Sequence, residues 1–450
     1  MVSPIVSLQA PKDVSIDEIE AELRSLWQSQ GTDEDSTAVT RAATFSLIVY
    51  EPDGTQQLLA SLGFYTGPID GIAGPRTKAA IEAAQKEYDM DVTGKSDEDL
   101  LTKLQSEFAI AKEKDKLTPE NKTAAVSYTP DSSGITADVI AASNPCRIIT
   151  LCPILGEDTG VTAQVSAYCP INKQSQNTLV CCEYITLSGT AEALDRIGGI
   201  IAELAIADLP KFVWWKATPT PELPLFKRLV SSSDTVIFDS SSFLEPEESL
   251  QTIAELLKQD TALADINWRR LAPWQELAAA AFDPPERRSA IYEVDRVTID
   301  YERGNESQAL MFLGWLASRL QWTPTEYKFE GGDYDIRRVK FTDEKQREIE
   351  AELAGLPTAD WGEIPGDLIS LKLTSTNEEA DCCTVLCSST TGCMRMEAGG
   401  GAQSCYIEQV TPLFDQKSEE LLGQQLQRWG REMLYEESMT ISAQILKLAE

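Results

Sequence analysis

Segments that favour strands alternate with segments that favour helices along most of this chain, and no other feature limits its fold as strongly. Between residues 141 and 262, runs of β-branched and aromatic residues at 147–151, 178–187 and 211–216 predict strands. Apolar residues at every third or fourth position over 190–204 predict a helix. Because helices that join strands cover the sheet, we expect an α/β protein with mixed β-sheets covered by helices.

The rest of the chain divides into segments of distinct composition. Residues 107–140 are rich in Lys, Glu, Ser, Thr and Pro and lack apolar periodicity, which predicts a linker. The later part repeats the mixed pattern, with a hairpin turning at Gly331-Gly332 and one long, apolar-striped last helix. We therefore expect an N-terminal helix and strand at 1–54, a small helical module at 55–106, the linker at 107–140, and α/β domains at 141–262 and 263–450.

Charge and the lack of histidine narrow the possible functions. The chain has 39 basic and 72 acidic residues, a formal net charge of −33, and no histidine. Because such an acidic surface repels phosphate backbones and anionic lipid, we expect neither a nucleic acid nor a membrane as partner. Without imidazole, Ser-His catalysis, Cys-His catalysis and His-ligated zinc are excluded.

Catalytic motifs are also missing from the sequence. It contains no glycine-rich phosphate loop after a strand and no nucleophile elbow of the hydrolase type. We therefore predict a protein that is not an enzyme and has no catalytic residues, no cofactor and no metal. The first residues do not form a signal peptide and no run approaches 18 apolar residues, so we expect a cytoplasmic protein.

A small module precedes the linker. Residues 62–77 read LGFYTGPIDGIAGPRT, in which Asp-Gly and Gly-Pro pairs favour tight turns between helices. The segment 55–105 resembles the peptidoglycan-binding-like domain, and this resemblance implies a three-helix fold. The resemblance leaves two roles open for the module. In the first, it is a docking or spacer unit. In the second, it binds sugar, and the chain is a carbohydrate- or envelope-binding protein.

The cysteines include a C-x₅-C pair, Cys387 and Cys393, which is separated by the turn-forming sequence SSTTG. If 383–387 and 393–397 are the arms of a hairpin, the two cysteines face each other at a separation that suits a disulfide. Closing so short a loop adds only about 2 kcal/mol, which suits a reversible redox pair. Two other interpretations stay open: inert thiols, or a cysteine-only zinc site completed by Cys382 or Cys383.

The other strand-associated cysteines are expected to remain reduced, because cytosolic thiols rarely form structural disulfides. Cys181 and Cys182 lie in an apolar strand, which predicts at least one thiol in the core. Cys146, Cys152 and Cys169 flank strands and are expected to be packing residues.

Two aromatic and basic clusters are candidate partner-binding surfaces. Adjacent tryptophans on a strand point to opposite faces, so one belongs in the core and the other is covered by a helix or exposed to a partner. For the second cluster, core tryptophan with surface arginine is an equally weighted alternative. The candidate residues are Trp214, Trp215 and Lys216 in the first cluster and Trp268, Arg269 and Arg270 in the second.

Three segments resemble a known family. Residues 145–149, 209–215 and 265–271 read PCRII, LPKFVWW and DINWRRL. They resemble the OpcA proteins, which are assembly and allosteric factors of glucose-6-phosphate dehydrogenase. The likeness extends over most of 140–449, and the stretch 8–14, together with the small module, resembles the cyanobacterial branch.

The resemblance implies a non-catalytic protein that binds glucose-6-phosphate dehydrogenase and raises its activity. For the cyanobacterial branch it also implies control by thioredoxin, with the disulfide form activating, and Cys387 and Cys393 match that role. We therefore predict a redox-responsive activator that binds the enzyme state of higher substrate affinity. The alternatives are the carbohydrate-binding protein and an enzyme of glycosyltransferase-like architecture.

Overall fold

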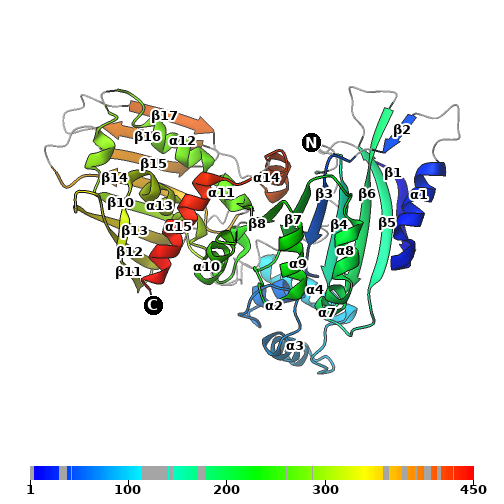
Figure 1. Ribbon diagram of the computed structural model, residues 1–450. Helices are drawn as coiled ribbons and strands as arrows, with labels where there is room; N and C mark the ends of the chain where they lie inside the picture. The colour runs from blue at the N-terminus through cyan, green and yellow to red at the C-terminus, as the bar shows by residue number, and fades with distance from the viewer. Residues whose placement is uncertain are drawn as a thin grey trace. The chain divides into compact units, whose positions relative to one another are not determined.

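The fold is that of a computed structural model (Figure 1). The structure describes residues 5–29, 38–41, 43–113, 140, 145–170, 178–259, 261–285, 287–357, 364–377, 384–390, 393–399, 407–412, 417–428 and 430–449. The chain divides into two compact units. The first comprises Met1–Asp239, Asp260–Ala264 and Ser418–Gly430, and the second comprises Ser240–Gln259, Asp265–Lys417 and Arg431–Glu450. Each unit has a large sheet with helices packed on it, so the predicted α/β class is confirmed.

Within the described residues, the sheet of the first unit contains nine strands. They are β1 (Ile5–Val14), β2 (Ala38–Arg41), β3 (Ser46–Tyr50), β4 (Arg147–Pro153), β5 (Thr162–Pro170), β6 (Thr178–Gly189), β7 (Lys211–Trp215), β8 (Thr235–Phe238) and β9 (Leu263–Asp265). Their order is β1-β5-β6-β4-β3-β7-β8-β9, and β2 pairs with β6. The central strands β6, β4, β3, β7 and β8 are parallel. Of these five parallel strands, β3 comes first in the chain and lies in the middle of the group. The order β6-β4-β3-β7-β8 is the strand order of doubly wound dinucleotide-binding folds.

Helices of the first unit fall into two groups. Those outside the small module are η1 (Ile16–Glu18), α1 (Ile19–Ser29), α7 (Ala191–Arg196), α8 (Gly198–Leu204), α9 (Pro224–Ser232) and α14 (Ser418–Gln425). The module contributes α2 (Thr55–Ser61), α3 (Pro75–Glu87) and α4 (Glu98–Glu113). Its chain enters directly from β3, so the central strand of the sheet leads into the module.

One buried glutamine holds the main turn of the module together. The Gln56 side-chain oxygen accepts hydrogen bonds from the backbone N–H groups of Asp70 (3.0 Å) and Gly71 (2.8 Å). Gln85 repeats this pattern, accepting from the N–H groups of Thr93 (2.9 Å) and Gly94 (3.0 Å). The turns at 70–71 and 93–94 are therefore fixed by side chains from α2 and α3, because buried backbone donors need partners.

In the second unit, the part of the chain that the structure describes forms a sheet of eight strands in the order β11-β12-β13-β10-β14-β15-β16-β17. They are β10 (Arg296–Glu302), β11 (Thr323–Gly331), β12 (Ile336–Thr342), β13 (Glu348–Leu356), β14 (Leu368–Thr374), β15 (Thr384–Thr390), β16 (Cys393–Gly399) and β17 (Ile407–Pro412). Its helices are η2 (Ser240–Ser242), α10 (Pro246–Leu257), α11 (Ile266–Arg270), α12 (Ala272–Ala280), η3 (Ala290–Glu293), α13 (Ser307–Leu320) and α15 (Met433–Lys447).

Two expectations for the C-terminal half have different outcomes. The hairpin of β11 and β12 is confirmed, and Gly331 and Gly332 supply the positive φ angles of 68° and 83° that its turn requires. The prediction of a single long last helix is wrong, because the segment forms α14 and α15. Gly430, at a φ of 91°, lies between them in a conformation that cannot continue a right-handed helix.

Candidate functional site

The predicted redox hairpin consists of β15 and β16. Its register pairs Cys387 with Met396 and Cys393 with Thr390. The hairpin is confirmed, but the expectation that the two cysteines lie opposite each other is wrong, since strand pairing continues three residues past Cys387. Thr390 is β-branched and favours a strand, which is compatible with strand pairing that continues past Cys387.

The side chains that would form the redox pair lie outside the described residues. For Cys387 and Cys393 the structure describes the backbone but not the side chain. For Cys382 and Cys383 it describes neither. The disulfide and the cysteine-only zinc site therefore both stay predictions. Among the residues that the structure does describe, no group of three or more His, Cys, Asp or Glu side chains is arranged to hold a metal ion.

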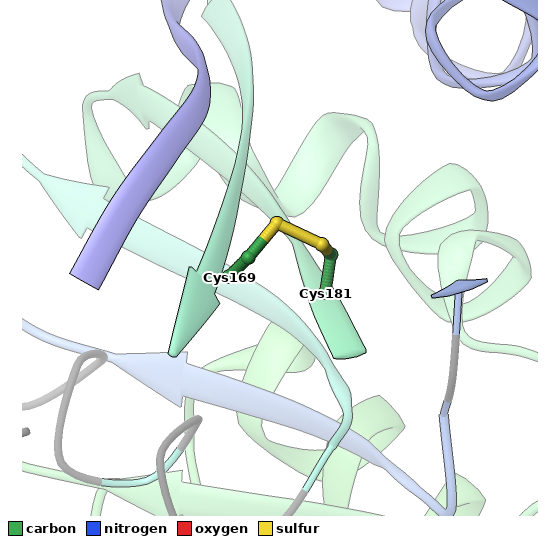
Figure 2. Close-up of a disulfide and its surroundings, with 2 residues drawn as sticks. All are labelled: Cys169 and Cys181. Carbon is green, nitrogen blue, oxygen red and sulfur yellow. A yellow bond between two sulfur atoms is a disulfide. The ribbon is translucent and has the colours of Figure 1, made fainter. Parts of the chain in front are cut away.

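A disulfide occurs elsewhere, between Cys169 at the end of β5 and Cys181 near the start of β6 (Figure 2). The two strands are antiparallel neighbours, and the Cα atoms of the two cysteines are 4.1 Å apart. Both side chains are completely buried. This corrects the expectation that Cys169 is only a packing residue and that these cysteines stay reduced. Linking residues 12 positions apart contributes about 3 kcal/mol in the chain-entropy account.

Two buried thiols lie next to the disulfide in sequence or space: Cys182 follows Cys181 on β6, and Cys146 immediately precedes β4. Cys182 and Cys146 are buried, are not part of a disulfide, and are hydrogen-bonded to each other. The predicted thiol in the core is therefore confirmed at Cys182. Burial raises the pKa of the Cys146 thiol, and the hydrogen bond from Cys146 lowers that of Cys182. The disulfide follows from the strand register, since Tyr168 lies opposite Cys182 and one step toward the end of β5 brings Cys169 beside Cys181.

A further thiol, Cys152, should resist alkylation in the native protein. Burial and, to a smaller degree, the nearby Glu51 carboxylate raise the pKa of this thiol to about 12. At pH 8 its thiolate should be about a thousandfold scarcer than that of an ordinary cysteine. We expect iodoacetamide to label Cys152 slowly in buffer and readily in urea, as measured by mass spectrometry. Equal labelling rates under the two conditions would contradict this prediction.

The first aromatic cluster belongs to the core of the first unit. Trp214 and Trp215 are each 1% exposed. Trp215 stacks on Tyr50 with the ring centroids 3.7 Å apart, and its Nε1–H donates to the Thr218 carbonyl at 3.1 Å. Of the two alternatives for the second tryptophan, cover by a helix is therefore confirmed and exposure to a partner is wrong, because helices cover both faces of the parallel sheet. Lys216 is partly exposed, and its Nζ lies 4.8 Å above the Trp214 ring.

The second cluster is also internal. Trp268 donates from Nε1 to Glu432 at 3.0 Å, and Arg269 donates to the other oxygen of that carboxylate at 3.3 Å. Arg270 donates to Asn267 at 3.2 Å, and all three predicted side chains are less than 10% exposed. The three side chains are thus engaged within the unit, so exposure to a partner is wrong here. Of the alternative, the core tryptophan is confirmed, while the expectation of surface arginines is wrong.

An ionic network in the second unit escaped the sequence analysis. Arg337 on β12 lies 2.9 Å from Glu247 on α10 and 3.3 Å from Glu306, which precedes α13. It also donates to the Tyr301 hydroxyl at 2.8 Å, and Tyr327 donates to Glu247 at 2.6 Å. Burial raises the pKa of Glu306. The members come from five separate segments, so no local motif could reveal them. Their mutual pairing ties the β11–β12 hairpin to the helices.

Known families match most of the chain. Residues 137–255 match the family described as "Glucose-6-phosphate dehydrogenase subunit N-terminal domain", and residues 261–439 match the corresponding C-terminal domain family. Residues 55–104 match the family described as "Putative peptidoglycan binding domain", as the sequence motif predicted. In the described part of the chain, no helix combines the length and apolar character needed to cross a membrane.

Relatives of known name cover nearly the whole chain. A protein described as "Putative OxPP cycle protein OpcA" from Synechocystis sp. is 59% identical over 99% of this chain and 94% of its own. Its namesake from Nostoc punctiforme is 58% identical over 99% and 96%. A solved biliverdin reductase from Synechocystis sp. is matched over 71% of this chain and 96% of its own, at 8% identity and a TM-score of 0.38. The chain belongs to the OpcA family.

Proposed function

We propose that this chain is a non-catalytic assembly factor and allosteric activator of glucose-6-phosphate dehydrogenase. The observation that carries the proposal is the pair of matches at 137–255 and 261–439, both to families described as subunits of that enzyme. Relatives named for the OxPP cycle, at 58% and 59% identity over 99% of the chain, add support.

An activator of this kind acts through differential binding. If it binds better to the enzyme conformation that holds glucose 6-phosphate more tightly, it shifts the enzyme population toward that conformation. The same coupling makes glucose 6-phosphate tighten the complex, because the coupling free energy between two binding sites is reciprocal. The two effects can be measured independently.

The test is steady-state kinetics of the dehydrogenase with and without this protein. The isolated protein should reduce no nicotinamide cofactor. At a saturating ratio it should lower the apparent KM for glucose 6-phosphate on the order of tenfold, which is a typical allosteric coupling. Bovine serum albumin at the same concentration is the control for non-specific stabilisation. Identical kinetics with and without the protein would overturn the proposal.

We propose further that the activator is redox-responsive and linked to thioredoxin through Cys387 and Cys393. The support is the C-x₅-C spacing within the β15–β16 hairpin and the family resemblance. A disulfide there would fix the hairpin in one shape, and its reduction would release that constraint. The register that pairs Cys387 with Met396 implies that the hairpin must rearrange between the two states.

Serine variants separate this pair from the disulfide in the first unit. Cys387→Ser and Cys393→Ser should weaken activation equally under oxidising conditions, because each removes the same bond. Cys169→Ser is the matched control, since it removes the disulfide of β5 and β6 instead. Thiol mapping of the oxidised wild type provides the direct check. If Cys387 and Cys393 are both labelled, or if only Cys169→Ser weakens activation, the assignment fails.

The carbohydrate-binding alternative has less support from the module's geometry. Tyr65 and Ile69, within the recognisable motif of the module, are buried. The backbone carbonyl of Asp70 accepts a hydrogen bond from Tyr50 on β3 at 2.9 Å. The motif residues are thus engaged inside the first unit.

A further inference from the structure

The parallel strands of the first unit end at one common edge of the sheet. The last residues of β3, β4 and β7 are Tyr50, Pro153 and Trp215. The chain adds strands to one side of β3 and then crosses to the other, so the switch point lies between β3 and β7. In open doubly wound sheets, ligands bind in the crevice outside the carboxyl ends of the strands at this point.

A loop of the small module lies against this edge. The Thr218 N–H, which follows β7, donates to the Ile69 carbonyl at 2.7 Å, and the Ile69 N–H donates to the Thr218 hydroxyl at 3.2 Å. From β3, the Tyr50 hydroxyl donates to the Asp70 carbonyl at 2.9 Å. The loop 65–72 therefore bridges the ends of the two strands that flank the switch point.

Gly71 brings the same loop against the third strand. A Cβ atom at Gly71 would lie 2.7 Å from Pro153 Cγ and 3.2 Å from the Tyr50 hydroxyl, and its φ of +75° strains any other residue. The glycine permits a backbone approach that a side chain would block. Such an approach is the one that glycines of dinucleotide-binding loops make to a pyrophosphate.

The side chains that follow β3 at this edge of the sheet are acidic, unlike those of a phosphate-binding site. Glu51 follows β3, where dinucleotide-binding folds carry their glycine-rich turn, and it pairs with Lys216 at the end of β7. Asp53, two residues later, accepts hydrogen bonds from the N–H groups of Thr55 (3.0 Å) and Leu155 (3.3 Å). Two carboxylates therefore lie where a pyrophosphate would approach, and the nearby lysine is already neutralised.

We propose that the loop 65–72 is the resident occupant of this crevice, and that residues 55–105 serve as a plug that closes it to nicotinamide dinucleotides and other phosphate-bearing cofactors. The module is then an integral part of the first unit. The first unit keeps the strand order of a cofactor-binding domain but uses its crevice to hold its own chain.

Hydrogen–deuterium exchange on the full chain tests the plug. In Gly71→Ser, the new side chain meets Pro153 at a positive φ, so peptides spanning 65–72 and 215–219 should exchange about tenfold faster. Gly74→Ser is the matched control, because a Cβ atom at Gly74 would meet nothing within 4 Å and serine suits the start of α3. Faster exchange confined to 65–72 would overturn the proposal, because the strand ends would not depend on the loop.

A milder variant and NADPH binding test the same proposal on protein that folds. Should Gly71→Ser fail to fold, Thr218→Val removes one hydrogen bond to Ile69 and should accelerate exchange at the same two peptides, to a smaller degree. NADPH at about 1 mM, the upper end of typical enzyme KM values, should neither bind the wild type nor change exchange at 65–72. Saturable NADPH binding that increases exchange of this loop would show a displaceable lid and would overturn the plug.

Discussion

Replacing Arg147 with methionine should cost about 3–5 kcal/mol of folding free energy, the usual effect of breaking a buried ion pair. Arg147 is 3% exposed, and its Nε donates to Glu183 at 2.7 Å. A second guanidinium nitrogen donates to the Leu204 carbonyl at 2.7 Å and pairs with Glu20 of α1. Methionine keeps most of the volume but leaves the buried Glu183 carboxylate without the arginine charge.

The position of this network explains why the effect should be large. Glu183 lies on β6 and also accepts a hydrogen bond from the Trp27 indole of α1. The network therefore joins the N-terminal helix to two central strands. Because the pair is buried, solvent screens it little, in contrast to an exposed pair.

Two controls make the measurement specific. Arg196→Met removes an ion pair to Asp158 whose arginine side chain is 56% exposed, and it should cost far less, because water and salt screen an exposed pair. The double variant Arg147→Met with Glu183→Gln removes the orphaned charge and should recover part of the loss. Urea unfolding provides the free energies. If Arg147→Met costs no more than Arg196→Met, the network does not stabilise the unit.

The sequence could predict the elements of the fold better than their assembly. Periodicity located β3, β4, β6 and β7, because each is a short apolar run rich in β-branched residues. It could not show that β3, before the module, is the central strand between β4 and β7. That arrangement depends on pairing between residues about 100 to 160 positions apart, which leaves no local pattern.

The candidate site was harder to predict, because burial is decided by neighbours remote in sequence. Trp214 and Trp268 were candidate partner residues, yet Trp268 finds its hydrogen-bond acceptor in Glu432, 164 positions away. The Cys169–Cys181 disulfide depends on the register of β5 and β6, which hydrophobic pattern alone does not fix. In contrast, the turn chemistry of Gly331-Gly332 is local and was predicted correctly.

Close packing of α13 against α15 depends on one glycine, so Gly314→Ala should destabilise the second unit by about 1–3 kcal/mol. A Cβ atom at Gly314 would lie 2.5 Å from the Ser438 carbonyl oxygen and 2.5 Å from the Ser442 hydroxyl. Both serines also donate to carbonyls of α13, Ser438 to Met311 at 2.6 Å and Ser442 to Leu310 at 3.0 Å. Relieving the clash would move a helix backbone and lengthen these bonds.

Alanine also favours helices over glycine by about 1 kcal/mol, so the clash must outweigh a gain. Gly423→Ala in α14 isolates that gain, because nothing lies within 4 Å of a Cβ atom at this helical position. We expect Gly423→Ala to raise the free energy of unfolding slightly and Gly314→Ala to lower it, in parallel urea titrations. Two changes of the same sign would mean that α15 adjusts to the extra methyl group without loss, and that Gly314 does not set the distance between these helices.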